Sequence, residues 1–459
     1  MTDDYDVVVI GAGTGGYSCA LRSAELGKRV ALIERDDRLG GTCLLRGCIP
    51  TKALLQSAAV LDTVNRSKEW GIIASGEADW PAIQAFENTV VDKLVLGLTS
   101  LISTRKIDVV HGTATLAAGP AVKVDGRTIT ATDVVIATGS RPKLLPDVQI
   151  TDRIITSDQA LWYPSIPISA VVIGAGAVGL EFASFYRSMG AKVTLVEALP
   201  SIAPLEDEDI SKEVARAFRK RGIESFAGAR VQGVDDHGDS VKVVVEVGGE
   251  TKAFTADVCL VAVGRGPVSE DLGLEEAAIE LDRGFVKVDG QLQTTASHVW
   301  AIGDVAATPL QLAHVSFTEG IAVAERTSGL EVADIDYVGI PRVTYCTPEI
   351  ASVGLTQAQA VERGHEVAVE KLNFQAIGKA NIVGEGGSVK VVADKDGGPV
   401  LGIHMVGPHV TDLIAEAMLI TNWEAVPAEV AALIHPHPTL SEAIGEAHLA
   451  LAGKPLHTA

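Results

Sequence analysis

Two cysteines, Cys43 and Cys48, lie five residues apart in the segment GGTCLLRGCIPTK, residues 40–52. In a regular α-helix this spacing separates the Cα atoms by roughly 8–9 Å, whereas a disulfide needs less than about 7 Å. A bridge would therefore require a distorted turn, for which Gly47 supplies a permissive backbone. The pair is either a strained, reducible disulfide or two buried thiols that pack as small apolar side chains.

A second reactive group lies near the end of the chain, in HPHPTLSE, residues 435–442. The prolines on both sides of His437 favour an extended, rigid turn. If a helix begins near Thr439, Glu442 falls in its first turn and can hold one ring nitrogen of His437. The other nitrogen can then take a proton from a thiol. The alternative is a capped loop with two solvated histidines.

A strand, glycine turn, helix and strand occur in this order twice, and they must position other reactive groups. The first copy has a strand over 6–10, the turn 11–16, a helix to about Leu26 and a strand over 29–34. The second has a strand over 169–173, the turn 174–179 and a strand over 192–197. From Gly16 to Glu34, and from Gly179 to Glu197, is 18 residues in each case. This full pattern is typical of dinucleotide-binding units.

Each glycine of such a turn has its own task. The first permits the tight turn, the second lets the backbone approach a pyrophosphate at the helix N-terminus, and the third allows close helix–strand packing. Glu34 and Glu197 would each accept a hydrogen bond from a ribose 2′-OH and repel a 2′-phosphate. No arginine follows Glu197 directly, so the second site favours NAD over NADP. The alternative is a pair of βαβ units without a ligand.

Later segments extend this organisation. Residues 133–139 and 257–264 each read as a late strand of a nucleotide-binding half, and 299–304 places Asp304 at a strand's carboxyl end, where ligands bind. Alternatively, Asp304 caps the next helix. After about residue 336 the pattern changes to strands over 388–393 and 400–406 and a helix over 411–423. This part is typical of an α+β domain built for association.

The composition excludes several classes of protein. The chain has 459 residues, and 38 basic against 59 acidic residues give a net charge of −21. A chain this acidic repels phosphate backbones and anionic lipids, so we expect no nucleic-acid or membrane partner. The sequence has neither a signal-peptide pattern at its start nor an apolar run long enough to span a membrane. Its five cysteines are too few for a secreted disulfide framework, so we expect a cytoplasmic protein.

Together these motifs resemble the flavoprotein disulfide reductase family, from GAGTGG at Gly11 to HPHPTLSE at His435, and most closely the branch that oxidises dihydrolipoyl groups. The resemblance implies an α/β fold with two Rossmann-like dinucleotide-binding domains and a C-terminal α+β dimerisation domain. It places the FAD-binding domain at 1–147 and 266–335, the NAD-binding domain at 148–265 and the dimerisation domain at 336–459.

The resemblance also implies residue roles, and it implies no metal site. Cys43 would be the exchange thiol facing the substrate, and Cys48 would be the thiolate facing the flavin. His437 and Glu442 would form an acid–base dyad that reaches the disulfide of the other subunit. Lys52 would lie beside the flavin and pair with Glu181. The expected cofactor-binding residues are Gly11, Gly13, Gly16, Glu34, Gly41, Thr42, Lys52, Gly139, Asp304 and Ala313 around FAD, and Gly174, Gly176, Gly179, Glu181, Glu197 and Gly264 around NAD.

The implied activity is oxidation of protein-bound dihydrolipoyl groups through a Cys43–Cys48 disulfide and FAD, with hydride passed to NAD⁺. The implied assembly is a homodimer that serves the lipoyl domains and core acyltransferase of a 2-oxoacid dehydrogenase complex, or a glycine-cleavage carrier protein. One alternative is an NAD(P)H-dependent reductase of a low-molecular-weight disulfide of the mycothione or glutathione type. Another is a non-catalytic flavin-binding scaffold, against which the intact Cys43, Cys48, His437 and Glu442 argue.

Arg46 is a departure from the resemblance. The family often has Asn-Val where this chain has Leu45-Arg46. An arginine between the cysteines could lower a thiol pKa, contact the substrate or face solvent. The sequence leaves these three roles open.

Overall fold

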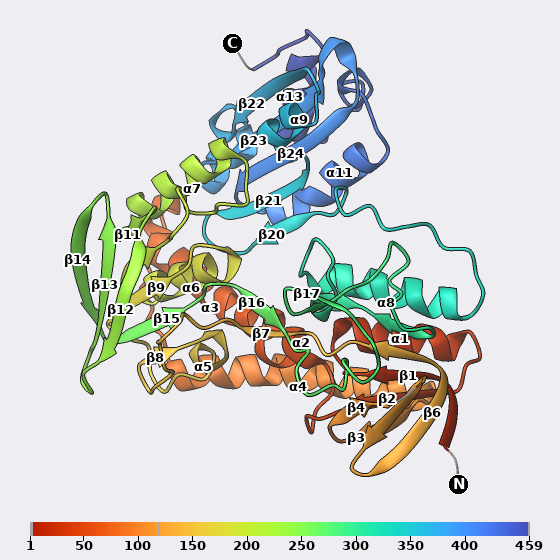
Figure 1. Ribbon diagram of the computed structural model, residues 1–459. Helices are drawn as coiled ribbons and strands as arrows, with labels where there is room; N and C mark the ends of the chain where they lie inside the picture. The colour runs from red at the N-terminus through yellow and green to blue at the C-terminus, as the bar shows by residue number, and fades with distance from the viewer. Residues whose placement is uncertain (1–2, 118, 458–459) are drawn as a thin grey trace. The chain divides into compact units, whose positions relative to one another are not determined.

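The structure is a computed structural model that describes residues 3–117 and 119–457. The chain divides into two compact units, each built from three segments (Figure 1). The first unit contains Met1–Ala53, Pro81–Lys143 and Arg265–Tyr337, and the second contains Leu54–Trp80, Leu144–Gly264 and Val338–Ala459. Each unit is described by itself.

The first unit contains one mixed sheet, in the order β3-β2-β1-β6-β5-β4, with β19 also paired to β6. Strands β3, β2, β1, β6 and β19 run parallel, while β4 and β5 add antiparallel pairs. The strands are β1 (Asp3–Ile10), β2 (Val30–Glu34), β3 (Asp108–His111), β4 (Ala114–Leu116), β5 (Ala121–Val124), β6 (Arg127–Ile136) and β19 (Val299–Ala301).

Both faces of this sheet are buried, which explains the continuous apolar run of β1. Val7 and Val9 pack with helices α1 (Thr14–Glu25) and α8 (Ala313–Thr327) on one face. Val8 and Ile10 face a separate cluster on the other side. The two helices approach closely because Gly320 lacks a side chain: a Cβ atom there would lie 2.4 Å from the carbonyl oxygen of Gly15.

The second unit contains a five-stranded parallel sheet, in the order β11-β10-β9-β15-β8, and a second five-stranded sheet that is antiparallel, in the order β20-β21-β24-β23-β22. The strands of the parallel sheet are β8 (Ile154–Ile155), β9 (Ser169–Ile173), β10 (Lys192–Val196), β11 (Ile223–Phe226) and β15 (Val258–Val261). Those of the antiparallel sheet are β20 (Arg342–Thr344), β21 (Glu349–Gly354), β22 (Val367–Asn373), β23 (Ser388–Asp394) and β24 (Val400–Gly407).

Helices and a smaller sheet complete the cores of this unit. The three-stranded sheet of β12 (Arg230–Asp236), β13 (Val241–Val247) and β14 (Glu250–Ala256) packs on the parallel sheet through alternate valines of β13. Helices α11 (Val410–Asn422) and α13 (Glu442–Leu451) cover the antiparallel sheet. The expected architecture of two Rossmann-like domains and a C-terminal α+β domain is therefore confirmed.

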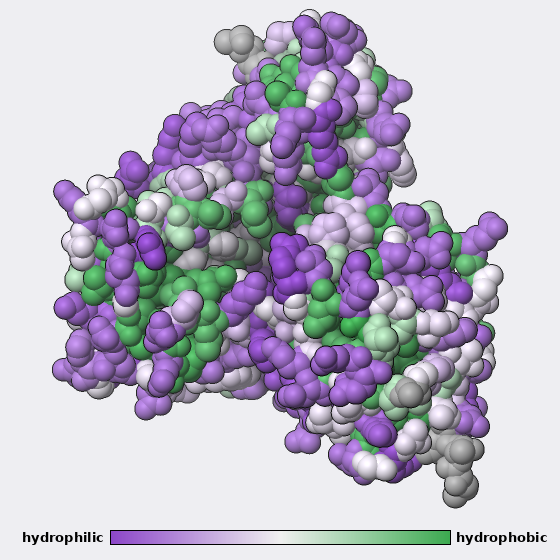
Figure 2. All heavy atoms as spheres, in the orientation of Figure 1, coloured by the Kyte–Doolittle hydropathy of each residue, from purple (hydrophilic) through white to green (hydrophobic). Residues whose placement is uncertain are grey.

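Shorter or peripheral elements connect these sheets. They are α2 (Gly41–Arg46), α3 (Cys48–Arg66), η1 (Ser67–Trp70), α4 (Trp80–Thr104), β7 (Ser140–Pro142), α5 (Ser157–Ala160), α6 (Ala177–Ser188), α7 (Glu208–Lys220), β16 (Arg265–Pro267), β17 (Leu281–Asp282), β18 (Phe285–Val286), η2 (Gly303–Val305), α9 (Gln357–Glu362), η3 (Phe374–Ala376), α10 (Gly378–Val383), η4 (Lys395–Gly397) and α12 (Pro427–Val430). Among the described residues, none of the helices has the length and apolar character needed to cross a membrane. Figure 2 shows hydrophilic residues over much of the face drawn, in keeping with the excess of acidic side chains.

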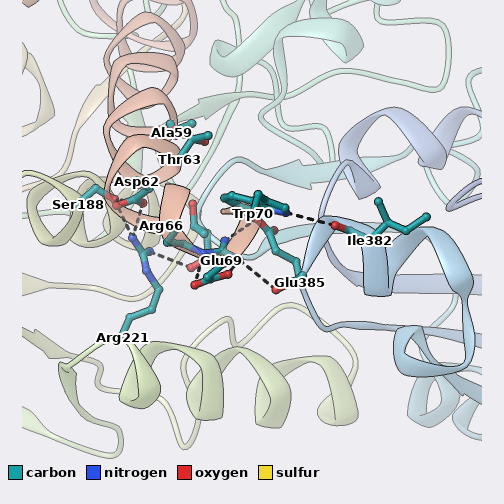
Figure 3. A network of polar contacts seen from close by, with 12 residues as sticks. Ala59, Asp62, Thr63, Arg66, Glu69, Trp70, Ser188, Arg221, Ile382 and Glu385 are labelled. Carbon is teal, nitrogen blue, oxygen red and sulfur yellow. Dashed lines mark hydrogen bonds and ion pairs between the residues drawn. The ribbon is translucent and has the colours of Figure 1, made fainter. Parts of the chain in front are cut away.

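The far end of α3 is held by polar contacts within the second unit (Figure 3). Asp62 accepts hydrogen bonds from Ser188 at 2.6 Å and from Arg221 at 3.2 Å. Arg66, one turn on, donates to Glu385 at 2.9 Å. The helix that begins at Cys48 therefore ends in a fixed network rather than in a frayed terminus.

Several element boundaries differ from the expectation. Strands β6, β15 and β19 end about three residues before Gly139, Gly264 and Asp304, because glycines with positive φ bend the chain out of each sheet. The expected helix start near Thr439 is wrong, since α13 begins at Glu442. The Glu442 carboxylate binds the backbone N–H of Thr439 instead, so residues 439–441 form a turn that precedes the helix.

Glu87 on α4 is fully buried, and neither of its carboxylate oxygens has a hydrogen-bond partner. Burial raises the pKa of this carboxyl to about 8. The folded protein therefore keeps Glu87 protonated at a pH where the unfolded chain has ionised it. A raised pKa of this kind removes stability progressively as the pH rises from about 4.5 to about 8.

We expect Glu87→Gln to raise the urea midpoint of unfolding, and the gain to grow between pH 5 and pH 8, because glutamine cannot ionise. Urea unfolding followed by circular dichroism at both pH values measures this. The exposed Glu77→Gln is the matched control and should leave the midpoint unchanged at both. A gain for Glu87→Gln that is equal at the two pH values would contradict the account.

Candidate active site

The two glycine turns have almost the same geometry, one in each unit. A Cβ atom on Gly16 would lie 1.8 Å from the carbonyl oxygen of Gly11, and one on Gly179 would lie 1.8 Å from that of Gly174. The third glycine of each turn therefore packs against the first, which holds the start of α1 or α6 close to the preceding strand. Gly11 and Gly174 have φ values of 100° and 103°, which L side chains rarely adopt.

The middle glycines, by contrast, have open space beside them. A Cβ atom on Gly176 would meet no heavy atom within 4 Å, and the nearest to one on Gly13 would be Gly41 Cα at 3.9 Å. Gly41 itself approaches Gly13 so closely that a Cβ atom would lie 2.6 Å from the Gly13 Cα. The space beside Gly13 and Gly176, at helix N-termini, fits the pyrophosphate of a dinucleotide.

Each turn is also fixed by the acidic residue that follows its second strand. Glu34 accepts hydrogen bonds from the N–H of Ala12 at 2.7 Å and of Asp36 at 3.0 Å. Glu197 accepts from Ala175 at 2.6 Å and from Leu199 at 2.8 Å. Both carboxylates are thus held beside a glycine turn, where a ribose hydroxyl of the dinucleotide would lie.

Asp304 lies in the short helix η2 and not at the cap of a longer helix, so the capping alternative is wrong. Its Oδ2 accepts a hydrogen bond from Ser140 Oγ at 2.5 Å, and Arg265 donates to the same hydroxyl at 2.7 Å. The buried Glu319 accepts from the N–H of Gly303 at 2.6 Å. These contacts fix one carboxylate next to Gly139, which precedes Ser140.

Ala313 is the first residue of α8, a helix of 15 residues. The first N–H groups of a helix have no partner within it and point toward negative charge. Together with Asp304 and the turn at Gly11, the start of α8 supplies the polar groups that FAD requires in the first unit. The residues present in this unit therefore fit the cofactor.

Cys43 and Cys48 are brought together as expected, on either side of a break in the helix. Cys43 lies in α2, Gly47 has φ −147° and ψ −108°, and Cys48 begins α3. Both are half-buried free thiols in this structure. The hydrogen bond to Cys48, followed by burial, raises the pKa of Cys43, while the Lys52 ammonium acts to lower it.

Arg46 forms an ion pair with Asp36, whose N–H binds Glu34. The arginine between the cysteines is thus joined to the loop after β2. Its charge is balanced by this carboxylate, which makes a purely solvent-facing role wrong. The pair links the redox segment to the carboxylate at the first glycine turn.

His437 and Glu442 also meet, in the second unit. His437 Nδ1 donates to Glu442 Oε1 at 2.8 Å, and the N–H of Thr439 donates to Oε2 at 2.8 Å. Burial acts to raise the pKa of Glu442, but these contacts and the neighbouring His435 outweigh it, so the pKa lies below its ordinary value. The ionised carboxylate can only accept, which leaves His437 Nε2 as the proton acceptor. The imidazole is 75% exposed in the single chain.

Other expected partners fall in different units. The cysteines and Lys52 belong to the first unit, and Glu181 and His437 to the second. Glu181 is buried and accepts a hydrogen bond from the N–H of Tyr345 at 3.0 Å. The Lys52–Glu181 pair and the approach of His437 to the cysteines stay predictions.

Sequence reasoning missed several residues around these groups. Ser140 and Arg265 support Asp304, but they are 125 residues apart and carry no joint signal in the sequence. Burial and the charges of Cys43 and Cys48 raise the pKa of Tyr17 to about 12, so this residue also lies near the thiols. Its position directly after the third glycine of the first turn was the one available signal.

Comparisons with known proteins agree with this geometry. Residues 5–320 match the family described as pyridine nucleotide-disulphide oxidoreductase, and residues 340–448 match the dimerisation domain of that family. The chain is 42% identical to a dihydrolipoyl dehydrogenase of Bacillus subtilis over the full length of both, and 38% identical to one of Mycobacterium tuberculosis over 98% of both.

Solved structures are similar as well. LpdA from Mycobacterium tuberculosis superposes with a TM-score of 0.89 at 27% identity, covering 97% of this chain and 99% of the other. The HOCl-induced flavoprotein disulfide reductase RclA from Escherichia coli gives a TM-score of 0.88 at 28% identity, covering 98% and 100%.

The two glycines of the second turn should respond differently to alanine. Gly176→Ala adds a methyl group where the pyrophosphate of NAD would lie, so we expect an unchanged melting temperature and a KM for NAD⁺ at least about tenfold higher. Gly179→Ala forces α6 away from Gly174 and should lower the melting temperature. Steady-state kinetics and thermal melts measure both. A normal KM for Gly176→Ala would show that NAD binds elsewhere.

Proposed function

The chain belongs to the pyridine nucleotide-disulphide oxidoreductase family, and we propose that it oxidises protein-bound dihydrolipoyl groups through Cys43 and Cys48, with FAD and NAD⁺ as electron acceptors. The observation that carries this proposal is the contact between the two thiols across Gly47, in the same unit as the glycine turn and carboxylates that fit FAD. Within the family, the full-length similarity to dihydrolipoyl dehydrogenases supports this substrate.

In the proposed reaction the oxidised enzyme has a Cys43–Cys48 disulfide. One dihydrolipoyl thiol gives its proton to His437 and attacks the sulfur of Cys43, which breaks the disulfide and releases Cys48 as a thiolate. The second dihydrolipoyl thiol then attacks the mixed disulfide, so that lipoyl disulfide leaves and Cys43 takes a proton. FAD, when bound, accepts the two electrons of the dithiol and passes them to NAD⁺ as hydride.

The electrostatics of the reduced pair suit this division of labour. The raised pKa of Cys43 keeps its proton in place, so the negative charge of the half-ionised pair belongs on Cys48. Lys52 lies one helical turn after Cys48, and its positive charge favours the thiolate form. Cys43 is accordingly the thiol for exchange with the substrate, and Cys48 the thiol for the flavin.

Two features of the second unit support the remaining assignments. The fixed Glu197 carboxylate would repel a 2′-phosphate, which favours NAD over NADP. The family's dimerisation domain supports a homodimer. In that dimer, the exposed His437 and its partner Glu442 serve the disulfide of the other subunit.

The biological setting is a further part of the proposal. Lipoyl groups on the domains and core acyltransferase of a 2-oxoacid dehydrogenase complex are the intended substrates, with a glycine-cleavage carrier protein as the other source of the same chemistry. The proposed location is the cytoplasm. The cofactor-binding domain limits given by the sequence stay proposals as well.

The purified protein with FAD should form NADH from dihydrolipoamide and NAD⁺, and form little NADPH from NADP⁺. Cys48→Ser should lower this turnover by about 10³-fold or more, because the exchange reaction loses a thiol. Cys259→Ala, which changes a buried thiol of the second unit, is the control and should keep turnover within about twofold. Absorbance at 340 nm measures all three.

Two results would contradict the proposal. Full dithiol turnover by Cys48→Ser would exclude the thiol mechanism. Oxidation of NADPH by a small disulfide, without turnover of dihydrolipoamide, would place the protein among reductases of low-molecular-weight disulfides.

A further inference from the structure

The loop that carries His437 has a second histidine, His435, whose surroundings are as specific as those of His437. His435 Nε2 lies 2.7 Å from Glu416 Oε1, and the two side chains are 13% and 31% exposed. Glu416 belongs to α11, so this contact ties the loop to a helix of the C-terminal domain. The expectation of two solvated histidines is wrong for His435.

The imidazole of His435 lies directly against α13. A Cβ atom on Gly445 would come within 2.5 Å of His435 Nδ1 and 2.8 Å of Cε1. Any residue other than glycine would therefore push the ring away from the helix. His435 is thus seated between the backbone of α13 and the carboxylate of α11.

We infer that His435 and Glu416 are positioning residues for the proton acceptor His437, an inference that rests on the proposed function. One residue, a proline with a restricted backbone, separates the two histidines, so the seat of His435 largely fixes where His437 begins. The other side of the loop is fixed independently, because Glu442 binds both His437 and the N–H of Thr439. The loop is therefore held at two points, and His437 lies between them.

The pair also places charge beside the acid–base dyad. The hydrogen bond to Glu416 is the main cause that raises the pKa of His435, and the Glu442 carboxylate adds to it. Within the described residues, the titratable groups that act on His435 are Glu416 on α11 and Glu442 and His448 on α13. Burial lowers the pKa of His448, which is therefore neutral near pH 7. A positive His435 beside Glu442 disfavours a second positive charge on His437.

The test compares His435→Gln and Glu416→Gln with the parent protein, using kcat/KM for dihydrolipoamide between pH 5.5 and pH 9. Both variants remove the positive charge of His435, so His437 should become protonated at higher pH. We expect the acid limb of the profile to move up by roughly half a pH unit in both variants. Gly445→Ala displaces the ring and should lower kcat/KM by about tenfold or more at every pH.

Two controls separate positioning from general damage. His457→Gln removes another histidine–glutamate contact on α13, His457 with Glu446 at 2.9 Å, and should leave the profile unchanged. Reduction of ferricyanide by NADH does not use His437, so it should stay at the parent rate in every variant.

Parent-like profiles for both His435→Gln and Glu416→Gln would overturn the inference. So would an equal loss of ferricyanide and dihydrolipoamide activity, since this would mean that the pair only supports folding. His437→Ala is measured alongside these variants. If it keeps full dihydrolipoamide turnover, the proposed role of His437 fails, which is distinguishable because the result concerns a different variant.

Discussion

The contact between the first and third glycines of each turn is the constraint on which the rest of the structure depends. Gly16 against Gly11 and Gly179 against Gly174 bring a helix start so close to a strand end that no side chain fits between them. This closeness leaves helix N–H groups and an open space beside the middle glycine, where two phosphates can lie. Because the same contact occurs in both units, one chain can hold two dinucleotides of different chemistry.

The chemistry that distinguishes the two sites comes from short segments outside the glycine turns. In the first unit, the break at Gly47 sets Cys43 against Cys48, and the Arg46–Asp36 pair joins that segment to the carboxylate of Glu34. In the second unit, the fixed Glu197 selects for a free ribose. Electron transfer then requires only that the flavin lie between the thiols and the nicotinamide, since the cofactors carry the electron chemistry.

The sequence predicted those parts of the site that depend on local backbone. Strand β9 has the expected limits, and both glycine turns and the break at Gly47 occur where their spacing required them. Contacts between distant residues could not be read in this way. The Ser140–Arg265 support of Asp304 and the His435–Glu416 pair depend on how separate elements pack, and the start of α13 was misplaced because a side chain of that helix captures the preceding turn.

The central claim is that Cys43 and Cys48 of one subunit work with His437 of the other. A heterodimer of one Cys48→Ser chain and one His437→Ala chain, purified with two different tags, tests this claim most directly. If the site is shared, one of the two sites has all its groups intact, and dihydrolipoamide turnover should be about half that of the parent dimer. If each chain supplies a whole site, both sites are damaged, and turnover no higher than that of the two mutant homodimers would contradict the account.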